Sequence, residues 1–454
     1  MDRSLYVNRC LQALQRAASA LGGDPGAPAW PVLAEMVIQA MSGPWRSFHT
    51  PEHIFDVGEG GSPTEVIAAL FHDLVYVQVD QGINLSLARH LADAVEETRE
   101  GLKLNPAAVR QDPLLHMTVA LFGFAHDQRL NPFAGQNEFL SAVVAVRSMR
   151  DLLAPAVLAR VVACIEATVP FRAAPAEGPD CSALLRLRLQ AVNQEMQLGL
   201  DEQDLTQAVE TAVRVANRDV GNFASEHPAQ FLDNTWNLIP ETNHDLVQVN
   251  VYTVRGYRTS LQKMEGFLSS LQAANVFRRY GAEPDADTHQ QRLALTQRNL
   301  QVACDYLRIK LVSVGLLEAL SLRIGTSVSL ASLMGKLSAQ QDAGPQLEHL
   351  LPSGQQTPPA TNAVQSMVVL LLESGRTADS VHDARHSPVA SYLVRQMGYA
   401  RTLALHEQAK AFFADTARAE SLLQAFPAEV TEVITRGVQT LFQQRSQALL
   451  QPAS

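Results

Sequence analysis

The stretch ALFHDLVY, residues 69–76, places an adjacent histidine and aspartate inside an otherwise apolar run. Burying a carboxylate without a partner costs free energy, and a neutral imidazole still needs hydrogen-bond partners. A helix end capped by Asp73 is one explanation, but apolar residues continue on both sides of the pair, so no helix end is indicated. We therefore expect His72 and Asp73 on one buried helix, held by a charged partner such as a metal ion.

Helical periodicity dominates the sequence on both sides of this stretch. Apolar residues recur at spacings of three and four, as in Leu11, Leu14 and Ala18, while Gly and Pro fall between the runs. The alternation typical of strands is rare. The predicted fold class is therefore all-α.

The length of 454 residues is too great for one compact core, and we expect two domains. The segment YGAEPDADTH, residues 280–289, is acidic, contains proline and has few large apolar side chains, as is typical of a linker. The sequence thus predicts a metal-binding domain over residues 1–280 and a second helical domain over residues 281–454.

The formal net charge of -10 excludes a broad nucleic-acid surface, because such surfaces neutralise phosphates with Lys and Arg. A small anionic phosphorylated substrate is compatible with this charge if a local positive group holds it. No run of about 18 uncharged apolar residues is present, so no membrane span is expected. The N-terminal residues lack the apolar core of a secretion signal, and the four cysteines have no Cys-x-x-Cys spacing, which favours a cytoplasmic protein with reduced thiols.

Two further motifs accompany the His-Asp pair. Upstream, RSFHTPEH (residues 46–53) contains His49 and His53 four residues apart, which would share a face if that piece is helical. Downstream, NEFLSA (residues 137–142) contains Glu138 and Ser141. A single such motif is weak, because a chain with 13 histidines contains some i,i+4 pairs by chance.

In order and local spacing, these motifs resemble the HD-domain superfamily of metal-dependent phosphohydrolases. The resemblance is closest to a branch of predicted hydrolases with the pattern Arg-x-Tyr-His-Asn-x-x-His, then Phe-His-Asp-x-Val-Tyr, then Asn-Glu-x-x-Ser-Ala, and finally a distal Asp. This chain departs from that pattern in Phe48, Thr50 and an insertion over residues 77–136. The insertion carries a second pair, His126 and Asp127, for which a polar surface loop is favoured over a lid.

The resemblance implies a helical bundle of HD-domain type and a divalent ion held by His49, His72, Asp73 and a later aspartate. His53 is either a ligand itself or an outer partner of the ligands. Imidazole and carboxylate ligands suit Mn, Fe, Co, Ni, Zn or Mg to differing degrees, so the sequence leaves the metal open.

For the later aspartate we choose Asp219, which lies in the helix-like stretch 209–224. A surface ion pair with Arg214 or Arg218 is the alternative role for Asp219. Asp233 is a competing choice, but it follows Pro228 and is typical of a helix-start cap.

The resemblance also suggests catalytic roles. Glu138 is expected to orient or deprotonate an attacking water, with Ser141 one turn away on the same face. Arg46 is expected to meet a phosphate, the alternative being an ion pair with Glu52 or Asp56. Arg172 is expected either to face the pocket or to lie in a solvated loop.

Three functions follow from these patterns. The first is a phosphohydrolase acting on a nucleotide or small phosphorylated metabolite through a metal-activated water. The second is an HD-type di-iron oxygenase, which would need further ligands from His53, His116 or His126. The third is a metal-stabilised regulatory or interaction protein without turnover, whose C-terminal helices serve as a packing domain or as the surface of a homo-oligomer.

Overall fold

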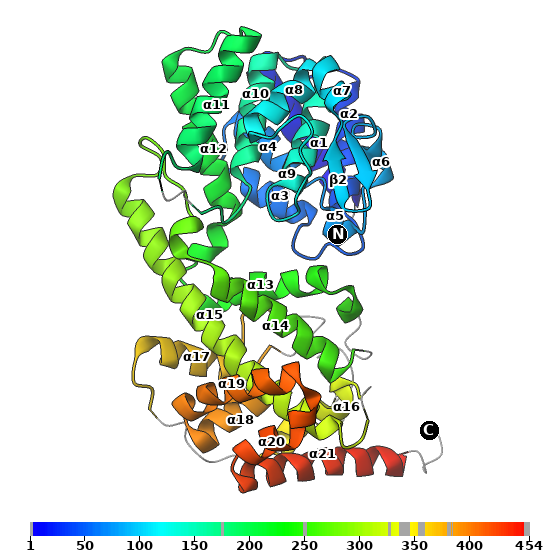
Figure 1. Cartoon of the computed structure of the whole chain (residues 1–454), viewed down its shortest axis with the longest axis vertical. Helices are drawn as coiled ribbons and strands as arrows, with labels where there is room; N and C mark the ends of the chain where they lie inside the picture. The colour runs from blue at the N-terminus through cyan, green and yellow to red at the C-terminus, as the bar shows by residue number, and fades with distance from the viewer. Residues whose placement is uncertain are drawn as a thin grey trace. The chain divides into compact units, whose positions relative to one another are not determined.

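The computed structural model describes residues 3–173, 177–247, 252–325, 328–335, 346–352, 359–378, 383 and 385–448 (Figure 1). The chain divides into two compact units. Unit 1 comprises residues 1–223 and 272–294, and unit 2 comprises residues 224–271 and 295–454.

The fold class is all-α, as the periodicity predicts. The described residues contain one sheet, the antiparallel hairpin of β1 (Val95–Thr98) and β2 (Gly101–Leu104), in which Val95 lies opposite Leu104. Gly101 has a φ of 111°, which suits the tight turn of this hairpin. None of the helices in the described part of the chain has the length and apolar character needed to cross a bilayer.

Twelve α-helices lie within unit 1 among the described residues, and many begin with a proline at the first helical position, where its missing N–H costs nothing. They are α1 (Arg3–Ala20), α2 (Ala29–Met41), α3 (Pro51–Gly58), α4 (Pro63–Phe71), α5 (Val77–Asp80), α6 (Leu85–Ala88), α7 (Pro106–Gln111), α8 (Pro113–Phe122), α9 (Gln136–Ser148), α10 (Pro155–Ala167), α11 (Cys181–Met196) and α12 (Glu202–Asp219).

Helix α15 begins in unit 1 and ends in unit 2, and the other described helices belong to unit 2. The described helices after α12, α15 included, are α13 (Pro228–Thr242), α14 (Val254–Ser270), α15 (Ala286–Ser321), α16 (Leu330–Met334), α17 (Ala363–Ser374), α18 (Pro388–Met397), α19 (Tyr399–Ala414), α20 (Ala419–Ala425) and α21 (Ala428–Ala448). Short 3₁₀ turns lie at Gly221–Ala224, His244–Val247, Ala273–Asn275, Leu347–Leu350 and Thr416–Arg418.

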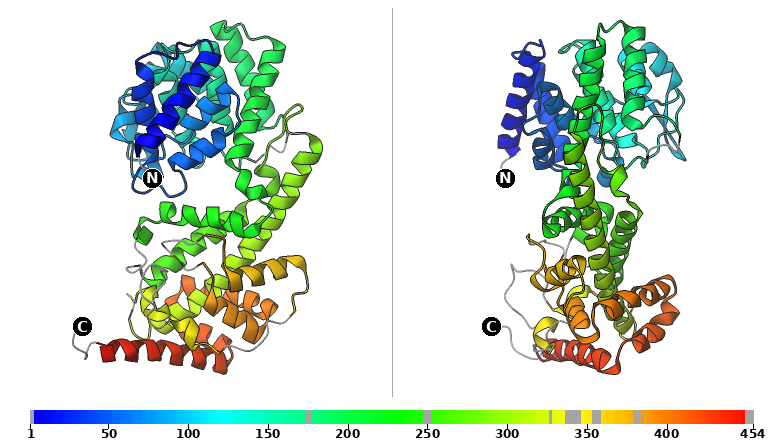
Figure 2. Two further views of the ribbon diagram at one scale, coloured as in Figure 1. Left: turned by 180° about the vertical axis from the view of Figure 1, so that it is seen from behind. Right: turned by 90° about the vertical axis from the view of Figure 1, so that its left-hand side faces the viewer.

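Helix α10 is the central element of unit 1. Val161, Val162 and Ile165 are completely buried, and the helix packs against α4, α8, α9, α11 and α12 (Figure 1). Helix α1 packs against α2 and α4, and it faces the viewer in the left-hand panel of Figure 2. This apolar packing fixes the mutual positions of α4, α9 and α12, which carry most of the predicted site residues.

A buried ion-pair group joins α4 to α12. Glu65 in the first turn of α4 accepts from Arg214 Nε at 2.6 Å and from Arg218 Nη2 at 3.1 Å. Arg218 Nε also donates to the carbonyl oxygen of Val57 in α3 at 2.7 Å. These bonds hold the end of α12 beside the α3–α4 pair, and they occupy both arginines that were alternative partners of Asp219.

Part of the insertion over residues 77–136 belongs to the core of unit 1. Its helix α8 packs on α9, α10 and α11, and Met117, Val119 and Leu121 are buried. His126 and Asp127 lie in an exposed turn after α8, in agreement with the surface-loop interpretation.

The division of the chain differs from the predicted boundary near residue 281. Helices α13 and α14 belong to unit 2, and the chain then returns to unit 1 over residues 272–294. One reason is that α14 is bound within unit 2 by a buried ion pair between Arg258 and Glu318, at 2.8 Å. Helical periodicity is the same on both sides of such a boundary. Composition marked only residues 280–289, which form a turn up to residue 285 and then the start of α15.

Candidate metal centre

Four side chains from three helical regions converge in unit 1: His53 of α3, His72 and Asp73 after α4, and Asp219 at the end of α12. One ligand atom from each lies within 4.8 Å of the other three. We call these four residues the His/Asp cluster. Two imidazoles and two carboxylates form the donor set that divalent metal ions of the borderline class bind in proteins.

The imidazole nitrogens lie close to the carboxylates without bonding to them. His72 Nε2 is 2.9 Å from Asp73 Oδ2 and 3.4 Å from Asp219 Oδ1, and His53 Nε2 is 3.3 Å and 3.1 Å from the same two atoms. Both nitrogens are buried, yet neither has a partner with hydrogen-bond geometry. Buried polar atoms are normally paired, so this arrangement fits a shared cation between the four groups.

The ring of His72 is oriented by the backbone. Its Nδ1 lies 2.8 Å from the carbonyl oxygen of Ala69, which can only accept a hydrogen bond, so Nδ1 carries the proton. In the neutral imidazole this leaves the lone pair on Nε2, the atom that faces the carboxylates. Metal-binding histidines commonly use this arrangement, in which a backbone carbonyl fixes the tautomer.

Charges within the His/Asp cluster depend strongly on one another. Burial lowers the pKa of His53, but Asp219 and Asp73 outweigh it and raise that pKa to about 9. The same carboxylates raise the pKa of His72 well above its usual range. Burial opposes ionisation of Asp219, but His72 and His53 lower its pKa to about 2. The carboxylates thus favour positive charge beside them, and a divalent ion would supply it while displacing the protons of the imidazoles.

Helix α4 ends at Phe71, so His72 is its C-terminal cap and Asp73 lies in the following turn. The expectation that the pair lies inside a helix is therefore wrong. The apolar run continues because Leu74 and Val75 are buried as well, although they are not helical.

Arg46 and Ser141 hold this turn. Arg46 donates to the carbonyl oxygens of Asp73 at 2.7 Å and Leu74 at 3.1 Å, and it pairs with Asp80 at 2.7 Å. Its remaining donor contact is with the sulfur of Met41. The predicted role of Arg46 in meeting a phosphate is therefore wrong, because the five donors of its buried guanidinium already have partners in the protein.

Ser141 is fully buried, and its hydroxyl accepts from the backbone N–H of Val75 at 3.0 Å. This bond fixes the position of the turn rather than reaching substrate. Asn137, at the start of the same helix, accepts from the N–H of Val77 at 3.3 Å. The NEFLSA motif thus positions the chain that follows Asp73.

His53, rather than His49, belongs to the His/Asp cluster. Helix α3 begins at Pro51, and its N-cap Thr50 has an extended backbone, so His49 precedes the helix and the i,i+4 geometry does not apply. The ring of His49 lies 5.7 Å from that of His53 and 4.7 Å from that of Tyr76, measured between centroids. His49 therefore borders the cluster, and His53, which the sequence left open as a ligand or an outer partner, takes the place predicted for His49.

The structure brings Asp219 into the cluster and places Asp233 elsewhere. Asp233 lies in α13 of unit 2, and its carboxylate accepts from the backbone N–H groups of Thr377 and Ala378. It lies within the helix rather than at its start, contrary to the expected cap.

Glu138 lies in the first turn of α9, and the charges of the His/Asp cluster affect the pKa of its carboxyl group. Burial is the main cause that raises its pKa to about 7, and Asp73 and Asp219 raise it further. A carboxyl group with this pKa is half protonated near neutral pH, which suits proton exchange with a water or a leaving group.

Three arginines gather near the C-terminal end of α10, and most of this cluster was not predicted from sequence. Arg172 donates to the buried Glu166 at 2.6 Å, and Arg188 donates to the same oxygen at 3.0 Å. Arg278 lies close enough to both Arg172 and Glu166 to sense their charges. Only Arg172 was considered from sequence, because no local pattern joins residues that are about a hundred positions apart.

The other histidines of unit 1 that could enlarge the centre lie apart from it. His116 pairs with Glu195 at 2.9 Å, and its ring lies 5.3 Å from that of the exposed His126. Among the described residues, the His/Asp cluster is the one group with the geometry of a metal site.

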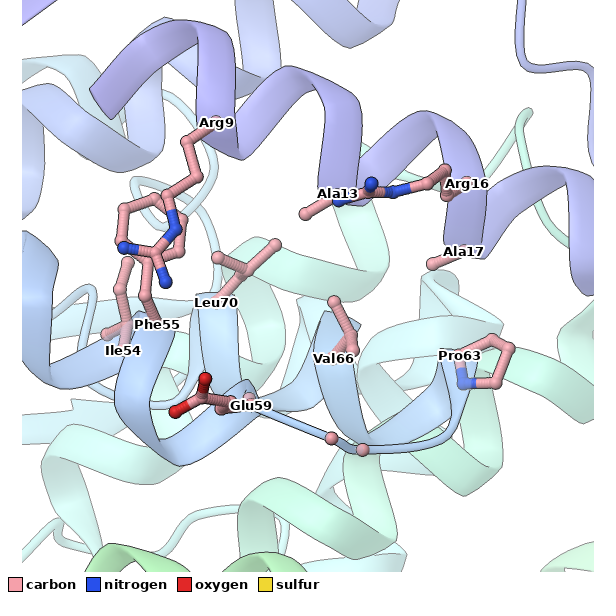
Figure 3. Close-up of a pocket in the computed structure, with 13 residues that line it drawn as sticks. Arg9, Ala13, Arg16, Ala17, Ile54, Phe55, Glu59, Pro63, Val66 and Leu70 are labelled. Carbon is pink, nitrogen blue, oxygen red and sulfur yellow. The ribbon is translucent and has the colours of Figure 1, made fainter. Parts of the chain in front are cut away.

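A cavity of about 340 Å³ lies between α1 and the α3–α4 pair (Figure 3). Arg9 and Arg16 project toward it from α1, and Phe55, Val66 and Leu70 form an apolar part of its wall. No member of the His/Asp cluster lines this cavity. The cavity is thus separate from the candidate metal centre.

The chain matches no protein-family model, no curated protein and no solved structure. A functional assignment therefore depends on the chemistry of the candidate metal centre and on the motif resemblance.

Proposed function

We propose that the chain is a metal-dependent phosphohydrolase of the HD-domain type, acting on a nucleotide or small phosphorylated metabolite. The observation that carries the proposal is the pair of buried Nε2 atoms of His53 and His72, which face two carboxylates without hydrogen-bonding to them. The three motifs in family order support the same assignment.

His53, His72, Asp73 and Asp219 would hold the divalent ion, which would polarise a phosphoryl oxygen and lower the pKa of a water. Arg46 and Ser141 keep the backbone after Asp73 in place, so that its carboxylate stays beside the imidazoles. Glu138 acts as general base, because its raised pKa lets it take a proton from the attacking water near neutral pH.

The di-iron alternative receives less support. Of the three histidines named as its further ligands, His53 belongs to the His/Asp cluster, whereas His116 and His126 do not. A regulatory protein without turnover would have the same metal centre, so only an activity measurement separates it from the hydrolase.

The test combines metal content with hydrolysis of phosphomonoesters, nucleotides and cyclic dinucleotides. The double variant His72→Ala with Asp73→Ala should lose at least about tenfold in bound metal and in hydrolysis, because half of the donor set is removed. The matched control is His126→Ala with Asp127→Ala, the same residue types in an exposed turn, which should behave as the wild type.

Full metal content in the His72/Asp73 variant would contradict the proposed centre. Loss of metal from that variant, together with no hydrolysis by the wild type, would favour the regulatory function instead.

A further inference from the structure

Three arginines gather around Glu166 at the end of α10. Glu166 Oε1 accepts from Arg172 Nη1 at 2.6 Å and from Arg188 Nη2 at 3.0 Å, and the Glu166 carbonyl oxygen accepts from Arg172 Nη2 at 3.0 Å. Arg278 donates to the carbonyl oxygen of Val169, three residues after Glu166. We call Arg172, Arg188 and Arg278 the arginine cluster.

Positive charge exceeds negative charge within this group. Arg172 and Arg188 pair with the single carboxylate of Glu166, which is completely buried and also attracts Arg278. Asp180 attracts Arg278 and Glu138 attracts Arg172 more weakly. Burial and then repulsion from Arg172 lower the pKa of Arg278 to about 10. Partly buried positive charge of this kind is costly unless an anion accompanies it.

Two buried donors of the arginine cluster have no hydrogen-bond partner in the protein. Arg278 Nη1 and Arg172 Nε are buried and make no hydrogen bond, and Glu166 Oε2 also has no donor. The side chains of Arg172 and Arg188 are 26% and 22% exposed, so a dissolved ion can reach them. The flat guanidinium group matches the oxygens of a phosphate, which accept two parallel hydrogen bonds.

One link between the arginine cluster and the candidate metal centre runs through α12. The side chain of Asn217 donates to the carbonyl oxygen of Arg278 at 2.9 Å and accepts from its N–H at 2.8 Å. Asn217 lies two residues before Asp219, on the last turn of the same helix. The backbone of Arg278 is thus fixed beside the end of α12 that carries a predicted ligand.

A second link runs through α9. Val169, whose carbonyl oxygen accepts from Arg278, packs so closely on Gly135 that a Cβ at Gly135 would lie 2.9 Å from a methyl group of Val169. Gly135 is the N-cap of α9, three residues before Glu138. The arginine cluster therefore borders the candidate centre on the side of its proposed general base.

We propose that the arginine cluster binds a second phosphate group of the substrate, so that the chain acts on compounds that carry two phosphates. One phosphate would be cleaved at the His/Asp cluster while the other is held by Arg172 and Arg278. This inference deepens the proposed hydrolase function and rests on it for the chemical step, but the anion site itself can be tested without turnover.

The first experiment measures binding of inorganic phosphate to the full chain by titration calorimetry. The His72→Ala with Asp73→Ala variant removes the metal centre and should still bind phosphate. Adding Arg172→Gln with Arg278→Gln should weaken that binding at least about tenfold, because two charge-assisted contacts are lost. Arg172→Lys with Arg278→Lys should give intermediate binding, and circular dichroism melting checks that each variant is folded.

The matched control is Arg160→Gln. Arg160 also lies on α10, is partly exposed and pairs with Asp204 at 2.8 Å, outside the arginine cluster. This change should leave phosphate binding within about twofold of the parent, since an exposed ion pair contributes little. Phosphate binding that disappears with the His72/Asp73 change, or that is unaffected by the Arg172/Arg278 change, would overturn the anion site.

The second experiment compares kcat/KM for a sugar bisphosphate and the corresponding monophosphate. The wild type should prefer the bisphosphate at least about tenfold, and this preference should largely disappear in Arg172→Gln with Arg278→Gln. Hydrolysis without any preference would overturn the two-phosphate inference and leave the hydrolase proposal intact. Failure to hydrolyse either compound would count against the hydrolase, while the calorimetry still decides whether the arginines bind phosphate.

Discussion

Asp383 in unit 2 and Asp73 in unit 1 are both carboxylates in polar clusters inside their units, but their surroundings differ. Asp383 Oδ2 accepts from Tyr257 at 2.6 Å, from Lys310 at 2.8 Å and from Trp236 at 3.1 Å. Asp73 lies beside Asp219 and two imidazoles whose nearest nitrogens make no hydrogen bond to either carboxylate.

The cluster around Asp383 is interpreted as structural, and the His/Asp cluster as functional. Lys310 lies 2.8 Å from Asp383, and the side chains of both are 6% exposed, so this carboxylate already has a cationic partner within the protein. The His/Asp cluster obtains its positive charge only from protons or from a bound cation. Changes at Asp383 should therefore act on folding, whereas changes in the His/Asp cluster should act on metal binding.

The largest effect is expected from Asp383→Ala. Removing this carboxylate leaves the Lys310 ammonium buried without its counter-charge, which should lower the free energy of unfolding by about 3–5 kcal/mol. Urea unfolding followed by circular dichroism measures the change, and metal content should stay at the wild-type level. A loss below about 1 kcal/mol would mean that Lys310 reaches solvent and that the two clusters do not differ as described.

Acidification should have a smaller effect on the same pair. Burial opposes ionisation of Asp383, but Lys310 and Arg376 outweigh it and hold the pKa of this carboxyl below its usual range. A carboxyl whose pKa is lower in the folded than in the unfolded chain stabilises the fold at neutral pH, and that contribution is lost as the pH falls through the folded-state pKa. Urea unfolding between pH 7 and pH 3 should show this loss, and the slope should be shallower in Asp383→Asn.

Metal removal tests the His/Asp cluster, the second member of the comparison. A metal present at about ten times its Kd should stabilise the folded chain by about 1.4 kcal/mol, and a chelator should abolish this increment. Thermal unfolding with and without chelator measures it. The His72→Ala with Asp73→Ala variant serves as control, because a chelator response that persists in it would place the metal at other residues.

The smallest effect on stability is expected from Ser141→Ala. The N–H of Val75 then loses its acceptor inside the core, at a cost of about 1 kcal/mol. Because that bond fixes the turn after Asp73, metal affinity should fall about tenfold as well. Metal titration and urea unfolding on the same sample distinguish this positioning role, since a purely structural serine would change stability alone.

Sequence predicted the helical class and three of the four clustered residues, because apolar periodicity and the His-Asp pair are local patterns. It placed His49 among the ligands and left His53 open, although Thr50 and Pro51 are typical of a helix start and would have placed His49 outside the helix. It could not identify Asp80 as the partner of Arg46, since 34 positions separate them. The stretch VHDARHSP, residues 381–388, contains a further His-Asp pair, for which the flanking polar residues and Pro388 predict a loop. His382 lies outside the described residues, and Asp383 lies outside the described helices but is buried.

Unit 1 is built from two separate pieces of chain, and this has a consequence for synthesis. Arg278 and the rest of residues 272–294 leave the ribosome only after α13 and α14, which belong to unit 2. At about 5–20 residues per second, the 48 residues from 224 to 271 delay that return by several seconds. Until that segment arrives, the hydrogen bonds of Arg278 to Asn217 in α12 and to Val169 after α10 cannot form.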